Sequence, residues 1–262
     1  MKILITIAYD GTNYCGWQRQ NNQVTVQEEV EKGIKKLFGR AIEVIGASRT
    51  DSKVHALGQR ATFNVSTTIP LSNIPLALNN NLPNDIRITK AEEVKDTFHP
   101  QYNAINKTYS YKIYNSNIIN PMYNNYAWLV KQKLNTSNMQ KAAHFLLGKH
   151  NFLSFCATGS SAKTFEREIY DITINNREVT QNKFSQCNNM PIIEIFVTGN
   201  GFLYNMVRII VGTLVYVGCG KLSVDDIKSI LLSQDRTKAG ITAPAMGLVL
   251  CNINYDFTTT TA

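Results

Sequence analysis

The order of strand-like and helix-like segments restricts the fold of this 262-residue chain more than any other feature. The first part reads strand, helix, two strands, helix and strand, and the second part has a similar number of elements in similarly mixed order. Mixed order without regular alternation is typical of an α+β protein whose sheets are mainly antiparallel. We therefore expect two similar lobes, residues 1–102 and 103–262, each with helices on the outer face of its sheet.

Hydrophobic periodicity defines the expected elements of the first lobe. Apolar residues alternate over Lys2–Tyr9, which predicts a strand. Thr25, followed three residues later by Glu28, forms a capping-box pattern that predicts the start of a helix. The other elements expected here are strands near 41–47, 59–65 and 86–94 and a short helix over Ile74–Asn79.

The second lobe is expected to begin with a strand over Lys107–Tyr114. Gly148 is placed to end a helix over Asn138–Leu147, because glycine readily takes the left-handed conformation found at helix ends. The remaining expected elements are strands near 167–174 and 191–198, an apolar helix from about Phe202 to Gly218, a helix from Ser223 and a last strand over Gly247–Asn254.

A single carboxylate, Asp51, occupies the polar loop between two of the predicted strands. The stretch Gly46–Gln59 reads GASRTDSKVHALGQ, in which Arg49, Lys53 and His55 surround the acid and no second acid occurs. Neighbouring positive charge favours the ionised carboxylate. Such a group is a poor general acid but can act as a nucleophile. The same residues are equally compatible with a polar turn in which the Asp side chain caps its own backbone.

Two side chains elsewhere are unusual for a simple core. Arg208 lies in the apolar run NMVRIIVGTLVYVG, and an unpaired buried charge costs several kcal/mol. It therefore either extends to solvent or pairs with a carboxylate of the first lobe, for which Asp51 is the candidate. Tyr109 shares a strand face with Tyr111. Core packing is the ordinary role of such tyrosines, but a tyrosine facing a cleft can stack on a base and transfer a proton.

The positive charge of the chain is concentrated in its middle. Lys and Arg outnumber Asp and Glu by 27 to 19, giving a formal charge of +8. From Thr97 to Phe165 there is no acid, whereas seven lysines and three histidines alternate with many aromatic residues. Such a stretch suits a surface that neutralises phosphates and stacks bases, although many of these aromatic residues must also serve the core.

Several classes of protein are disfavoured by what the sequence lacks. The five cysteines are scattered without CxxC spacing, so neither a zinc site nor a disulfide framework is expected. The longest apolar run, Met206–Val217, is too short to span a bilayer and contains Arg208. No phosphate-binding glycine motif and no signal peptide are recognisable. We expect a soluble cytoplasmic protein that uses no metal and no cofactor.

Seven blocks of sequence, in order over nearly the whole chain, carry a resemblance to a known family. The blocks are YDGTNYCGWQRQ (9–20), TVQEEVEKGI (25–34), ASRTDSKVHALGQ (47–59), NNLPNDI (80–86), FHPQYNAINKTYSYKIYN (98–115), GFLYNMVRIIVGTL (201–214) and DRTKAGITAPAMGLVL (235–250). Together they resemble the tRNA pseudouridine synthases of the TruA type. The match includes the candidate reacting residues and is therefore more specific than a likeness of fold alone.

The resemblance implies a pseudouridine synthase fold with a central cleft and a homodimer that acts on the tRNA anticodon stem-loop. Uridine at positions 38, 39 and 40 would be isomerised to pseudouridine without cofactor or metal. By the matching motifs, Asp51 would be the nucleophile, and Tyr109 would stack on the base and transfer a proton. Arg208 would form an ion pair with Asp51, and Arg49 would hold the flipped-out nucleotide.

The Asp51 loop departs from the usual family pattern, GRTDAGVHA. Ser48, Ser52 and Lys53 replace Gly, Ala and Gly. A glycine at the position of Lys53 can use a backbone geometry that lysine adopts only at a cost. Two other functions therefore stay open. One is an RNA-binding module or tRNA folding chaperone of this fold without turnover. The other is a phosphodiesterase or glycosidase-like hydrolase, which ordinarily needs a metal or paired carboxylates.

Overall fold

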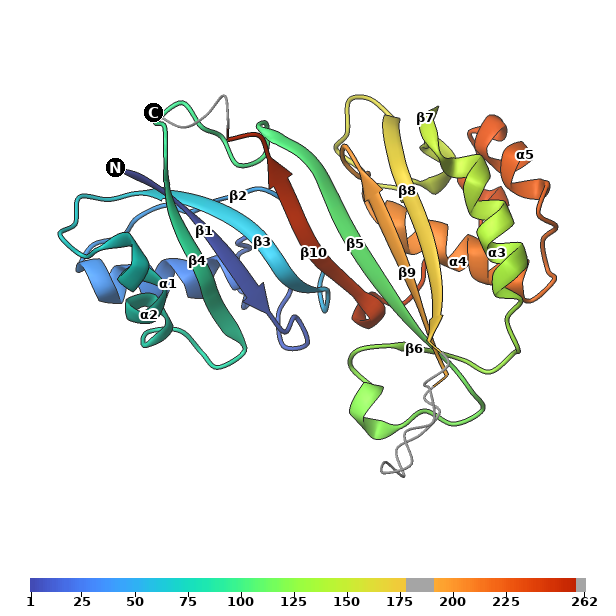
Figure 1. Cartoon of the computed structure of the whole chain (residues 1–262), viewed down its shortest axis with the longest axis horizontal. Coiled ribbons are helices and arrows are strands. Elements are labelled where there is room, and N and C mark those ends of the chain that lie inside the picture. Colours follow the sequence, from blue (N-terminus) through green and yellow to red (C-terminus); the bar gives the residue numbers. More distant parts are fainter. Residues whose placement is uncertain (178–190, 258–262) are drawn as a thin grey trace. The chain divides into compact units, whose positions relative to one another are not determined.

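The computed structural model describes residues 1–177 and 191–257 of the chain (Figure 1). Their contacts form two compact units. The first unit contains Met1–Lys107 and the segment from Val249 onward, and the second contains Thr108–Leu248. The sequence-based division lay after residue 102 and assigned the last strand to the second lobe, whereas the contacts group that strand with the first unit.

Four main strands form the sheet of the first unit, in the order β4-β1-β3-β10. Their bounds are β1 Lys2–Tyr9, β3 His55–Asn64, β4 Ile86–Val94 and β10 Leu248–Tyr255, and the short β2, Ile45–Gly46, pairs with β3. Strand β1 is antiparallel to both β3 and β4, whereas β10 runs parallel to β3. The predicted strands over β1 and β4 are confirmed, and the one expected near 41–47 is reduced to two residues.

Strand β1 is buried on both of its faces, which explains its nearly continuous apolar sequence. Ile3, Ile5 and Ile7 are fully buried on one face. On the other, Leu4 belongs to a cluster with Val94 and Phe98, against which Tyr255 and Phe257 pack. The first unit therefore has a core on each side of its sheet.

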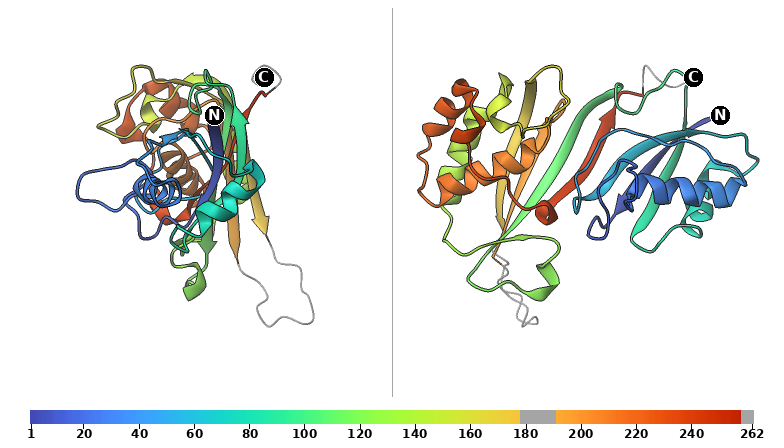
Figure 2. Two further views of the ribbon diagram at one scale, coloured as in Figure 1. Left: turned by 90° about the vertical axis from the view of Figure 1, so that its left-hand side faces the viewer. Right: turned by 180° about the vertical axis from the view of Figure 1, so that it is seen from behind.

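Helix α1 (Val26–Phe38) buries Val26, Val30 and Ile34, and it crosses one face of this sheet in the right panel of Figure 2. The helix begins where the sequence predicts, with Thr25 as its N-cap residue, but the predicted capping box is absent. The Thr25 side chain makes no capping hydrogen bond and its Oγ1 is buried without a partner, while Glu28 pairs with Lys32. The cap is redundant because the first helical N–H groups, of Val26 and Gln27, donate to the backbone carbonyls of Gly16 and Trp17. Helix α2 (Ile74–Asn79) matches its predicted bounds.

The sheet of the second unit has the strand order β5-β9-β8-β7. The bounds are β5 Ala104–Asn115, β6 Trp128–Val130, β7 Gly148–Asn151, β8 Glu166–Arg177 and β9 Ile192–Gly199. Strand β8 is antiparallel to β7 and β9, and β6 lies parallel to β5. The short strands β6 and β7 were not predicted, because three or four residues carry too little periodicity to be detected.

The described residues of the second unit form three α-helices: α3 (Thr136–Ala143), α4 (Met206–Gly218) and α5 (Asp226–Ser233). Helix α4 begins later than the predicted Phe202, because Asn205 has a left-handed backbone with φ 58°. Before α5, the Ser223 N–H donates to the Asp226 carboxylate and the Asp226 N–H donates to the Ser223 hydroxyl. A reciprocal cap is thus present at this helix rather than at α1.

The α+β class with a mainly antiparallel sheet is confirmed. Within the described ranges, no helix is both long and apolar enough to cross a membrane.

Candidate active site

The Asp51 loop, defined here as residues 47–54, connects β2 to β3 and presents a half-buried Asp51. The end of β1 and the segment that follows it support the loop through four contacts. Tyr14 O accepts hydrogen bonds from Lys53 N–H and from the Ser52 hydroxyl, each at 3.2 Å. Thr50 O accepts from Trp17 N–H at 3.1 Å, and the Thr50 hydroxyl lies 2.7 Å from the Tyr9 hydroxyl.

Gly16 explains why the two segments can approach so closely. It has φ +90°, and a Cβ added there would lie 2.4 Å from Thr50 O. Any side chain would therefore displace the carbonyl one residue before Asp51. The glycine of the motif CGW is needed for the shape of the loop.

Side chains from two strands hold the start of the loop. Gln59 Nε2, on β3, donates to Ser48 O at 2.6 Å. Lys107 Nζ, at the end of the first unit, donates to Ala47 O at 2.8 Å. With Val54 N–H donating to Asp51 O at 3.2 Å, hydrogen bonds secure the loop backbone on both sides of Asp51.

Lys53 has a left-handed backbone, with φ 64°. The expectation that this position uses a geometry suited to glycine is confirmed. The loop nevertheless keeps its hydrogen bonds to Tyr14 with lysine in place, and the Lys53 side chain is exposed. The departure from the family pattern therefore introduces local strain and a cation without altering these backbone contacts.

The three basic neighbours of Asp51 in the sequence differ in their surroundings. Arg49 and Lys53 are exposed. His55 is buried, with Nδ1 3.1 Å from Asp10 Oδ1 and 3.0 Å from Gly11 N, which donates to it. The contacts of His55 Nδ1 thus involve the segment after β1, whereas Arg49 and Lys53 present their charge to solvent.

Tyr109 and Arg208 belong to the second unit, whereas Arg49 and Asp51 belong to the first. Tyr109 lies in β5, is 6% exposed, and makes an edge-to-face contact with Phe202 at 5.3 Å between ring centroids. Its neighbour Tyr111 is fully buried and donates to Pro244 O at 2.7 Å. Burial raises the pKa of the Tyr111 hydroxyl far above its usual value.

Arg208 occupies the first turn of α4 and is half-buried. Its Nε donates to Ala243 O at 2.7 Å and its Nη1 donates to Asn205 Oδ1 at 2.6 Å. Asn205 reaches this position through its left-handed backbone, a conformation that asparagine tolerates better than most residues. These bonds hold the guanidinium against groups of its own unit. The alternative in which the Arg208 side chain simply extends into solvent is therefore not what the structure shows.

Comparison with known proteins identifies the family of this chain. The family model of tRNA pseudouridine synthase matches residues 5–103 and 142–256. Proteins named tRNA pseudouridine synthase A are similar over nearly their whole length. Those of a Thermoanaerobacter species and of Ruminiclostridium cellulolyticum are each 49% identical, over 253 and 254 residues, and that of Clostridium acetobutylicum is 47% identical over 253. Each alignment covers 97% of this chain and 99% of the relative.

The chain belongs to the tRNA pseudouridine synthase family. Asp51 and Arg208 lie within the two matched segments, whereas Lys107 and Tyr109 fall between them.

The sequence analysis of this tRNA pseudouridine synthase did not predict that Gln59 and Lys107 support the Asp51 loop. Lys107 is one of two lysines in the tyrosine-containing strand β5, AINKTYSYKIYN. A contact with Ala47, 60 positions earlier, cannot be read from that pattern.

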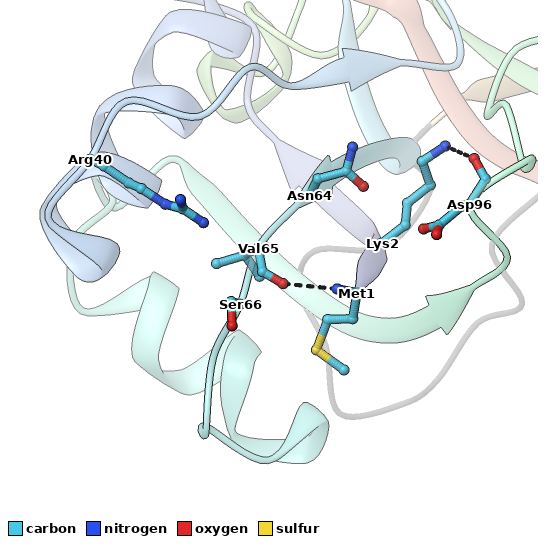
Figure 3. Close-up of a pocket in the computed structure, with 7 residues that line it drawn as sticks. All are labelled: Met1, Lys2, Arg40, Asn64, Val65, Ser66 and Asp96. Carbon is cyan, nitrogen blue, oxygen red and sulfur yellow. Dashed lines mark hydrogen bonds between the residues drawn. The ribbon is translucent and has the colours of Figure 1, made fainter.

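The cavity shown in Figure 3 lies apart from these candidate residues. It has a volume of about 420 Å³ and is lined by Met1, Lys2, Arg40, Asn64, Val65, Ser66 and Asp96. The amino terminus donates to Val65 O, and the Lys2 ammonium donates to the carbonyls of Asp96 and Phe98. The amino terminus and Lys2 are therefore both engaged by backbone carbonyls, and we assign the cavity no chemistry.

In the part of the chain that the structure describes, no cluster of three or more His, Cys, Asp or Glu residues is placed to hold a metal ion.

The exposed lysines of the acid-free stretch Thr97–Phe165 are Lys131, Lys133, Lys141, Lys149 and Lys163. Lys149 lies 3.8 Å from Glu166, but both side chains are largely exposed, so this pair leaves most of the positive field accessible.

Proposed function

We propose that this protein isomerises uridine to pseudouridine in tRNA, at positions 38, 39 and 40 of the anticodon stem-loop. The observation that carries the proposal is the near-complete match to tRNA pseudouridine synthases together with a buttressed loop that presents Asp51. The formal charge of +8 and the exposed lysines suit a polyanionic substrate.

The reaction needs the target nucleotide outside the base stack. Flipping a base costs roughly a few kcal/mol, and cationic side chains beside the site can offset part of this through the phosphates. Arg49 is exposed and lies two residues before Asp51. We assign it to hold the flipped nucleotide.

Asp51 acts on the ribose. Either its carboxylate attacks the anomeric carbon and is displaced when the base re-bonds, or it assists departure of uracil by removing a ribose proton that it returns when the base re-bonds. In both routes the bond from C1′ to N1 breaks, the base turns, and a bond from C1′ to C5 forms. The C5 proton is lost and N1 gains a proton, so the product is an isomer of the substrate and no oxidant, reductant or second substrate is consumed.

Tyr109 and Arg208 complete the proposed set. The ring of Tyr109 would stack on the detached base and its hydroxyl would transfer a proton. Arg208 would pair with Asp51 and hold it ionised. Its Nε and Nη1 each donate to a group of the second unit, and these bonds hold the guanidinium in a defined orientation.

The experiment follows release of tritium from unmodified tRNA labelled at uridine C5. If the protein is an isomerase, the amount of tritium released should equal the amount of pseudouridine formed, and the pseudouridine should map to positions 38–40. Binding without release would favour the chaperone alternative, and strand scission or free uracil would favour the hydrolase. Release at other positions would refute the assigned site on tRNA while leaving the reaction intact.

The resemblance also implies a cytoplasmic homodimer, which we include in the proposal. The subunit mass is 29.4 kDa, so light scattering coupled to size-exclusion chromatography separates monomer from dimer directly. A monomeric mass in active preparations would refute this part.

A further inference from the structure

Lys107 is a cation in an unusual place. Its side chain is half-buried, and no carboxylate among the described residues lies within ion-pair distance of its ammonium. Its hydrogen bond goes to a backbone carbonyl, that of Ala47. Removing a cation from water without an anionic partner costs folding free energy, so this lysine is poorly explained as a stabilising residue.

The carbonyl that Lys107 contacts begins the Asp51 loop. Ala47 is itself buried and its N–H donates to Arg60 O at 2.7 Å, which fixes the peptide before Ala47 to β3. The ammonium fixes the peptide after Ala47. The next carbonyl, of Ser48, is held by Gln59, so two consecutive peptides are secured four and three residues before Asp51.

A hydrogen bond from a charged donor is stronger and more directional than one between neutral groups. At this point in the chain it constrains where the loop leaves β2. Displacement of a reacting group by about 1 Å costs on the order of 100-fold in rate, so the entry of the loop matters to a carboxylate that must reach a ribose carbon.

We propose that Lys107 is a positioning residue, which holds the Asp51 loop in its reactive conformation by binding the Ala47 carbonyl. It does not touch the substrate and acts through the loop. The inference rests on the proposed function for its kinetic part, but its structural part concerns the loop alone.

Burial lowers the pKa of Lys107 to about 8, and no charged side chain contributes to that shift. Near neutral pH the ammonium form therefore dominates and the charge-assisted bond is present. The charged form of Lys107 therefore persists beside the loop although burial disfavours it. A charged group kept in such surroundings is expected at a functional site, where its role outweighs its cost in stability.

The test compares Lys107→Met and Lys107→Arg in the full-length protein, with Lys2→Met as a matched control. Lys2 also donates to backbone carbonyls of the first unit, but at the cavity of Figure 3. Lys107→Met is expected to lower kcat by about 10- to 100-fold with tRNA affinity changed less than about threefold, since phosphate contacts are untouched. Lys107→Arg should recover most of kcat, and Lys2→Met should leave it unchanged.

Hydrogen exchange supplies a readout independent of turnover. The amides of residues 47–54 should exchange faster in Lys107→Met, while those of β1 and β4 stay protected. Unchanged loop exchange would overturn the proposal, as would faster exchange with full kcat, or a fall in kcat accompanied by general loss of protection. If the wild-type protein releases no tritium, the proposed function fails, and loop exchange alone then decides whether Lys107 positions the loop.

Discussion

Replacing Lys53 by Gly should stabilise the protein. A residue with a Cβ pays roughly 1–2 kcal/mol to occupy the left-handed region, in which Lys53 has φ 64°. Glycine removes that cost, but it also gives the unfolded chain more conformational freedom, which lowers the free energy of unfolding by about 0.4–1 kcal/mol. The difference predicts a gain of about 0.5–1 kcal/mol in the free energy of unfolding. The Lys53 N–H bond to Tyr14 O is kept, because it involves only backbone.

Urea unfolding at equilibrium measures this difference, and two further variants isolate its cause. Lys53→Ala removes the charge but keeps the Cβ, so it should show little of the gain. Gln234→Gly changes another left-handed residue, with φ 51° at the end of α5, and should show a similar gain. A Lys53→Gly protein less stable than wild type, alongside a stabilised Gln234→Gly protein, would refute the strain argument and mean that the Lys53 side chain makes a favourable contact.

Four other predictions concern the charges of the site and surface. Asp51→Asn should abolish tritium release with tRNA affinity within a few-fold, because the amide cannot be a nucleophile; turnover above background would remove the assignment. Arg208→Met should abolish activity and lower stability by about 3 kcal/mol, as its charged hydrogen bonds are lost; full activity in a rate assay would refute the pair with Asp51. Because the pKa of Lys107 falls from 10.5 to about 8 on folding, the folded state binds fewer protons between those values, so stability should rise with pH there by up to ~3 kcal/mol. Lys107→Met should lack that rise in urea titrations at several pH values, and an identical rise would assign it to another group. Binding of tRNA measured against salt should show a log–log slope smaller by about two to three units, with sequence preference retained, when glutamine replaces Lys131, Lys133 and Lys149; an unchanged slope would place these lysines away from the RNA.

The sequence predicted well those features that depend on local pattern. Strands over Lys2–Tyr9 and Ile86–Val94 and the helix over Ile74–Asn79 match the structure. Each is marked locally, the strands by their isoleucine and valine residues and the helix by the proline in its first turn. The special geometry at Lys53 was also predictable, since a family glycine marks a backbone that needs glycine.

What the sequence could not predict depends on contacts between distant segments. The capping box at Thr25 was a sound local pattern, but carbonyls of the preceding loop satisfy the helix instead. The hydrogen bonds of Gln59 and Lys107 to the Asp51 loop have no local signature either. Local sequence patterns predict the structure that a segment favours by itself. The hydrogen-bond partners of these residues depend instead on which distant segments the fold brings next to them.

The parallel pairing of β10 with β3 has a consequence for folding during synthesis. Strand β10 follows β3 by more than 180 residues, and the whole second unit is synthesised between them. Until then β3 lacks its parallel partner at His55 and Ala56, and the cluster around Phe98 lacks Tyr255 and Phe257. We therefore expect the second unit to fold on the ribosome while the first waits for its last strand. The unit that begins first is completed last, so the start of β3, which directly follows the Asp51 loop, gains its partner strand only when translation of the second unit is over.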